Sequence, residues 1–160
     1  GDPVGRSVRD GHGVVLSQAL LLLLGLLLML PAVAAGQGAV PLKVQVIYAA
    51  NEPGGVDSRL GTLAAELQKT FRYSRYELLD SPQGSAPVNQ SWGTGLPGDR
   101  SLEITPTAIT DGEYTLTVRV RGAGGQALVN TRVKLKAGRT VLVGGPTHQK
   151  GVLIIAITAG

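Results

Sequence analysis

The chain is poor in the residue types that most enzymes use as nucleophiles, bases and metal ligands. Its 160 residues contain no cysteine and only two histidines, and aromatic residues make up 4% of the chain. The absence of cysteine excludes a disulfide framework, a thiol nucleophile and a cysteine-ligated zinc or iron–sulfur site. Charged residues are also scarce, at 16%, and leave a net charge of +4. Glycine and proline, by contrast, are abundant with 23 and 9 residues, which favours many short strands joined by turns.

The first 35 residues have the pattern of an export signal. Arg6 and Arg9 precede an apolar run over residues 14–30, and Pro31 then leads into the small residues of 32–36. A basic region, an apolar region and a small-residue cleavage site predict a signal peptide over 1–35 and a periplasmic or extracellular protein. The alternative is a retained anchor in the inner membrane, because the run 14–30 reaches the lower end of the about 17–25 residues that span a bilayer.

After a short linker over residues 36–41, residues 42–160 are expected to form a single domain of common size. Residues 42–50 alternate as a strand, and Asp57 or Ser58 can cap an amphipathic helix that runs to about Thr70. Residues 73–80 read as a second strand. A strand–helix–strand unit of this length predicts two parallel strands with a right-handed crossover.

From residue 81 onward the pattern is that of short strands separated by turns. Strands are expected at about 87–93, 101–107 and 140–143, and the apolar run 151–158 predicts a strand buried on both faces at a sheet centre. Residues 113–121 and 126–136 predict a hairpin. If its loop closes symmetrically, Glu113 faces Lys134 and Arg121 faces Gln126.

The predicted fold class is therefore α+β: a strand–helix–strand unit followed by a mostly antiparallel sheet, or small sandwich, of six to eight short strands. One amphipathic helix is expected to pack on it. The predicted core consists of Val44, Val46, Leu60, Leu63, Leu67, Leu78, Leu116, Val118, Val133, Leu142, Leu153 and Ile155.

His148 is the one candidate for a catalytic base after the signal segment. It lies in the Gly-rich segment 144–151, and no G-x-S-x-G nucleophile motif accompanies it. We expect His148 to be a solvent-exposed residue of a loop. One histidine without cysteine also falls short of the three or four ligands of a zinc site. The sequence therefore predicts no catalytic residue, no metal site and no cofactor.

The predicted hairpin gathers cations on its polar face. Arg119, Arg121 and Arg132 share that face with two lysines that Glu113 partly offsets, so the three arginines are expected to remain exposed. Such a face is either a solvated surface that discourages edge pairing or a patch for an anionic membrane surface or polysaccharide. Nucleic acid is not expected as a partner, because Tyr73 and Tyr76 have opposite parity on a strand and cannot form one stacking platform.

Three segments carry a resemblance to known sequences. They are the stretch 51–57 (NEPGGVD), the stretch 71–79 (FRYSRYELL), and the ending that runs from Gly144-Gly145-Pro146 through VLIIAI. In these segments the chain resembles uncharacterised small exported bacterial proteins over residues 42–160. The resemblance implies a compartment and a domain extent, and it brings no activity.

The function expected from these features is that of a non-catalytic envelope or secreted domain that binds a partner protein or has a structural role. Two alternatives remain: a periplasmic hydrolase-like enzyme that uses His148, and a binder of anionic surfaces through Arg119, Arg121 and Arg132. Contact with a membrane is expected only through an uncleaved N-terminal segment or through weak electrostatic attraction.

Overall fold

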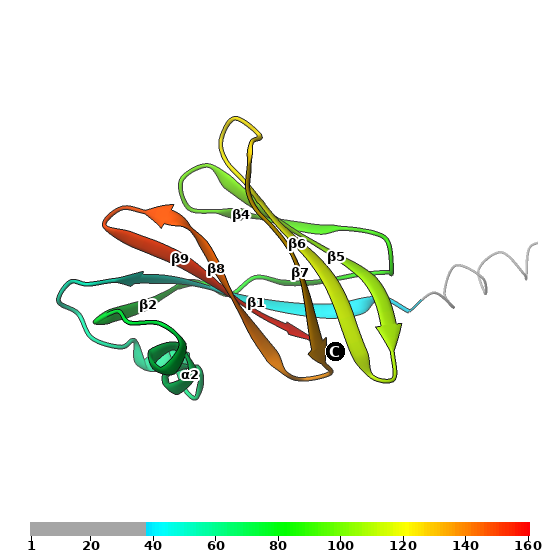
Figure 1. The fold of residues 1–160 in the computed structure, drawn as a ribbon, viewed down its shortest axis with the longest axis horizontal. Helices are drawn as coiled ribbons and strands as arrows, with labels where there is room; N and C mark the ends of the chain where they lie inside the picture. The colour runs from blue at the N-terminus through cyan, green and yellow to red at the C-terminus, as the bar shows by residue number, and fades with distance from the viewer. Residues whose placement is uncertain (1–37) are drawn as a thin grey trace, which may run out of the picture. The chain divides into compact units, whose positions relative to one another are not determined.

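The computed structural model describes residues 38–160, so the predicted signal peptide and residues 36 and 37 of the predicted linker lie outside the described residues. Residues 40 and 41, expected in the linker, already belong to the first strand. This part of the chain forms nine strands, a 3-10 turn and one short α-helix (Figure 1). In chain order these are β1 (Val40–Ala50), η1 (Ser58–Leu60), α2 (Leu63–Thr70), β2 (Arg75–Asp80), β3 (Gln83–Ala86), β4 (Trp92–Leu96), β5 (Arg100–Thr110), β6 (Glu113–Arg121), β7 (Ala127–Lys136), β8 (Thr140–His148) and β9 (Gly151–Ala159).

The strands form two antiparallel sheets. The first has five strands in the order β2-β1-β9-β8, with β3 also paired to β1, and the second has four in the order β4-β5-β6-β7. Each strand of the second sheet pairs with its neighbour in sequence, because tight turns such as Gly98-Asp99 and Asp111-Gly112 reverse the chain with positive φ angles.

The main core lies between the two sheets. Alternate residues of β1 and β9 on the first sheet pack against alternate residues of β5 and β6 on the second, and most of these side chains are fully buried. β9 lies between β1 and β8, the second sheet covers one of its faces, and η1 and α2 cover the other, so Leu153 to Ile157 are all buried. The prediction of a central strand over 151–158 is confirmed, and the molecule is a mostly β sandwich.

A second, smaller core lies under the helix. Leu60 and Leu67 pack onto the outer face of the first sheet, where Ile47, Ile154 and Tyr76 are buried. The helix predicted from residue 57 or 58 to 70 is interrupted: Gly61 has a φ of 55°, so the 3-10 turn ends there and α2 begins only at Leu63. The break leaves Leu63 half-buried.

The expected parallel crossover between residues 42–50 and 73–80 is wrong. β1 and β2 are directly paired and antiparallel. The parallel neighbour of β2 is the loop segment 55–57, through a bridge between Val56 and Tyr76. The chain thus runs along the outer edge of β2, parallel to it, before it forms the helix.

Two further expectations need correction. The 113–136 hairpin forms, but its turn pairs Arg121 with Ala127, one residue beyond the predicted Gln126. A register shift between Val120 and Arg121 adds a second residue on β7, so Glu113 faces Lys136 instead of Lys134. The shift preserves which residues share a face. The segment 144–148 belongs to β8, so His148 is the last residue of a strand and does not lie in a loop.

The fold class is accordingly richer in strands than the predicted α+β arrangement of six to eight strands. Most of the predicted core is buried, whereas four residues are only half-buried: Leu63, Leu78, Val133 and Leu142. Among the helices of the described part, none is long and apolar enough to span a membrane.

Candidate functional site

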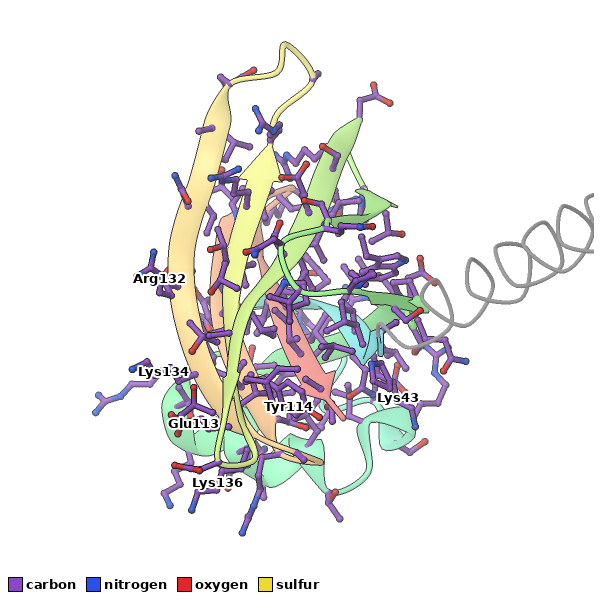
Figure 2. The ribbon with its side chains drawn as sticks, turned by 90° about the vertical axis from the view of Figure 1, so that its right-hand side faces the viewer. Lys43, Glu113, Tyr114, Arg132, Lys134 and Lys136 are labelled. Carbon is purple, nitrogen blue, oxygen red and sulfur yellow. The ribbon has the colours of Figure 1, made fainter. Side chains whose placement is uncertain are left out.

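The outer face of the second sheet carries a group of cations on two neighbouring strands. We define the cationic surface as Arg119 and Arg121 on β6 together with Arg132, Lys134 and Lys136 on β7. On β7 the three cations occupy every second position, so their side chains leave the same face, about 7 Å apart along the strand. Figure 2 shows Arg132, Lys134 and Lys136 in sequence along this strand, with Glu113 at the end near Lys136.

Two of the three predicted arginines border one hollow on this surface. Arg119 lies opposite Asn130 across the β6–β7 ladder, and Thr117 lies opposite Arg132. Together with Thr131 they line a shallow hollow of about 400 Å³. The hollow therefore offers two guanidinium groups beside the Asn130 amide and the Thr117 hydroxyl, a set of donors suited to an oxyanion.

The expectation that all three arginines lack an acidic partner needs correction. Glu103 on β5 lies opposite Arg119, and its Oε1 is 3.6 Å from Arg119 Nη1. Both side chains remain partly exposed, so this ion pair is weak and leaves the Arg119 charge available to a ligand. Arg121 and Arg132 are exposed, and no ion pair within residues 38–160 engages them.

A second polar cluster lies at one end of the first sheet. Tyr48 on β1 is buried, and its ring packs edge-on against His148 with 5.9 Å between the ring centroids. The Arg75 guanidinium lies 5.5 Å from the centroid of the same ring. Arg75 is itself held by two carboxylates, Glu52 at 2.6 Å and Glu77. The cluster is thus an ion-paired arginine stacked on an aromatic platform.

The hydroxyl of Tyr48 is enclosed without a well-formed hydrogen bond. Burial raises its pKa above the ordinary value, and the nearby Glu52 carboxylate raises the pKa further. The backbone of Lys150 and the charge of Arg75 act in the opposite direction. Tyr48 is therefore neutral at physiological pH, and its role at this site is that of a packing surface between Arg75 and His148.

The position of His148 differs from the expected exposed loop. The His148 ring is half-buried, and its edge-on contact with the Tyr48 ring positions it. No serine hydroxyl of the described residues forms a hydrogen bond with the imidazole. A general base must lie within hydrogen-bond reach of the proton that it removes. Across residues 38–160 there is also no group of three or more histidine, aspartate and glutamate side chains that could hold a metal ion.

The outer edge of β2 is covered by the loop that precedes the helix. Tyr76 exchanges backbone hydrogen bonds with Gly55 and Asp57. One pair of residues further along, the Asp57 carboxylate accepts from Leu78 N at 3.1 Å, and Arg59 Nη2 donates to Leu78 O at 2.9 Å. Two side chains thereby take the place of a neighbouring strand. Hydrogen bonds from Arg59 hold the pKa of Asp57 well below its usual range.

The segments that carry the resemblance meet at this end of the sandwich. Glu52 and Asp57 come from the first, Arg75 from the second, and Gly151, at the start of the third segment's apolar run, lies against Ala49 and Ala50 of β1. The sequence offered no signal for the Tyr48–Arg75 contact or the Glu103–Arg119 pair, because each joins different strands. No family model, curated protein or solved structure matches the chain.

Proposed function

We propose that this protein is a non-catalytic binding module whose cationic surface holds an acidic polysaccharide. The observation that carries the proposal is the row of Arg132, Lys134 and Lys136 on one face of β7, next to the hollow that Arg119 and Arg132 border. The expected export of the chain, suggested by residues 1–35, would bring this surface to a compartment in which acidic polymers are exposed.

The shape of the cationic surface favours a linear ligand over a bilayer. Its charges are confined to two strands, β6 and β7. On the β5 side, Arg121 faces Ser101, Arg119 faces Glu103 and Thr117 faces Thr105, so the cations end at β6. A flat anionic membrane would contact the whole outer face of the second sheet, including the Glu103 carboxylate, which would repel it. A polymer with regularly spaced acidic groups can instead follow the row of cations on β7.

The hollow adds a site for one acidic group of such a chain. A sulfate or carboxylate between Arg119 and Arg132 would receive charge-assisted hydrogen bonds from two guanidinium groups, which bind oxyanions in a bidentate manner. Asn130 can donate to the same group through its amide. Exposed ion pairs contribute about 0.2–1 kcal/mol each, so five cations are sufficient for weak, multivalent binding.

The remaining polar cluster supports a structural role over a catalytic one. Arg75 is occupied by Glu52 and Glu77, and His148 is packed against Tyr48, so these groups stabilise the end of the first sheet. A hydrolase-like activity would require a nucleophile within reach of the imidazole.

The test is binding of the full chain to immobilised heparin, as a probe for acidic polysaccharides, and to phosphatidylglycerol vesicles in parallel. We expect retention on heparin at low salt and release as salt rises, because the Debye length falls from about 10 Å at 0.1 M to about 3 Å at 1 M. No retention on heparin at low salt would refute the proposal. If the chain binds vesicles but not heparin, and charge reversal on β7 abolishes the vesicle binding, the choice of a polysaccharide as the ligand is refuted.

A further inference from the structure

The free edge strands of the two sheets differ in how well they are protected against pairing with another chain. A strand edge exposes unpaired N–H and C=O groups that can pair with another chain, and proteins protect such edges with charges, short strands or covering segments. The edge of β2 is covered by residues 55–57 and by the side chains of Asp57 and Arg59. The edge of β7 carries the like charges of the cationic surface, and β4 is a strand of five residues in all, two of which are glycines that weaken it as a pairing edge, whereas β8 has nine residues.

The edge of β8 has none of these protections over its first half. β8 ends the strand order of the first sheet, and within residues 38–160 no strand pairs with its outer side (Figure 1). Residues Thr140 to Gly144 pair with β9 in regular register, and the register shift falls between Gly144 and Thr147. The sequence TVLVG of this stretch has no charge. It is therefore five residues of regular, uncharged edge.

The side chains along this edge are incompletely buried on both faces. On the inner face, Val141 of β8 and both Val129 and Val133 of β7 pack only partly against the main core. On the outer face, Leu142 is half-buried and lines a hollow of about 660 Å³ that also touches Leu63 at the start of α2. The sandwich thus lacks cover along the margin that β7 and β8 share, and there is room beside Leu142.

We propose that two copies of the chain pair through this edge, antiparallel and centred on Leu142 of β8. The stretch is complementary to itself in that register: Leu142 faces Leu142, Val141 faces Val143, and Thr140 faces Gly144 of the second copy. Residues directly opposite in an antiparallel pair lie on the same face, so every contact is between apolar or small side chains. On the inner face, Val141 and Val143 of the second copy extend the cover over the exposed margin of the main core.

Pairing in this way joins the two five-stranded sheets into one continuous sheet across a twofold axis, an isologous contact. Because it rests on backbone hydrogen bonds and apolar pairs, it does not weaken with added salt. Binding through the cationic surface does. The two proposals therefore respond differently to the same variable.

The absence of cysteine makes the register directly testable. In the variant Leu142→Cys, the two thiols lie opposite one another across the twofold axis, at the Cβ separation of a cross-strand pair, close to that of a disulfide. The matched control is Val88→Cys, an exposed apolar position in the loop between β3 and β4. We expect disulfide-linked dimers of the full-length Leu142→Cys chain to form at least about tenfold faster than those of the control, because pairing raises the effective thiol concentration.

A second variant tests the same register without a cross-linking reaction. Leu142→Lys places two like charges face to face at the axis, and sedimentation is expected to show loss of the dimer while circular dichroism shows the strand content unchanged. Val88→Lys should leave the dimer intact. Cross-linking of Leu142→Cys no faster than of the control, or a dimer that survives Leu142→Lys, would overturn the proposal. Retention of Leu142→Lys on heparin would separate that result from a failure of the proposed function.

Discussion

Gly151 is a position at which the addition of a single methyl group is expected to destabilise the fold strongly. It opens β9 opposite His148, where β9 passes close to β1. A Cβ at this residue would overlap the carbonyl oxygen of Ala49 and would lie 2.8 Å from the Cβ of Ala50. The Ala49 oxygen belongs to the backbone of a central strand, so it cannot move without distorting the β1–β9 pairing. The variant Gly151→Ala must therefore displace one of the two central strands.

Overpacking a well-packed core typically lowers the free energy of unfolding by about 1–3 kcal/mol. Because the obstacle here is backbone, we expect about 3 kcal/mol, near the upper end of that range. With a slope of about 1.5 kcal/mol per molar urea for a domain of this size, the unfolding midpoint falls by about 2 M. Trp92 is the only tryptophan and packs partly against the main core, so its fluorescence reports unfolding.

Gly144 supplies the matched control on the neighbouring strand. A Cβ there would meet no atom within 4 Å, so Gly144→Ala is expected to change the free energy of unfolding by less than about 0.5 kcal/mol. Equal urea midpoints for the two variants would refute the described approach of β9 to β1.

Three further outcomes are expected. Since Asp57 has a lowered pKa in the folded state, its contribution to stability is complete above the ordinary value of about 4 and is lost as the pH falls toward the lowered pKa; Asp57→Asn should flatten acid unfolding curves in that window. Ile104→Ala, at a fully buried position between the sheets, should cost about 2–5 kcal/mol in urea unfolding, whereas Ile109→Ala, half-exposed on the same strand, should cost under about 0.5. Arg75→Ala should release the loop 51–57 and raise its rate of amide hydrogen exchange, and unchanged protection there would contradict the role assigned to the ion pairs.

Local patterns in the sequence predicted the parts of the fold that depend on local physics. Alternation specified the faces of β6 and β7, and the continuous apolar run of 151–158 identified the central strand. Pairing partners depend on residues far apart in the chain. The segment Gly144-Gly145-Pro146 suggests a loop by composition, yet it lies in β8, because an edge strand with a register irregularity tolerates proline.

The same division applies to the candidate site. The alternation of side chains along β6 and β7 was enough to place Arg119 and Arg132 on one face. The predicted register was wrong by two residues, and a shift of two residues leaves the same side chains on that face. The pairing of Arg119 with Glu103 could not be predicted, because it requires β5 to lie next to β6 at a particular offset. The Tyr48 cluster needs the ends of three strands to meet, and no spacing in the sequence encodes that.

The cationic surface is tested most directly by comparing two charge reversals of equal size. Arg132→Glu combined with Lys134→Glu reverses the row on β7, and Lys69→Glu combined with Arg72→Glu makes the same change in net charge at exposed positions outside the cationic surface. At about 0.2–1 kcal/mol for each of two lost ion pairs and a similar repulsion from each of two new carboxylates, the β7 variant should bind heparin about fourfold to several-hundredfold more weakly at low salt. The control should bind like the wild type. Equal weakening of both variants would show that net charge alone governs binding, and would contradict a specific role for the cationic surface.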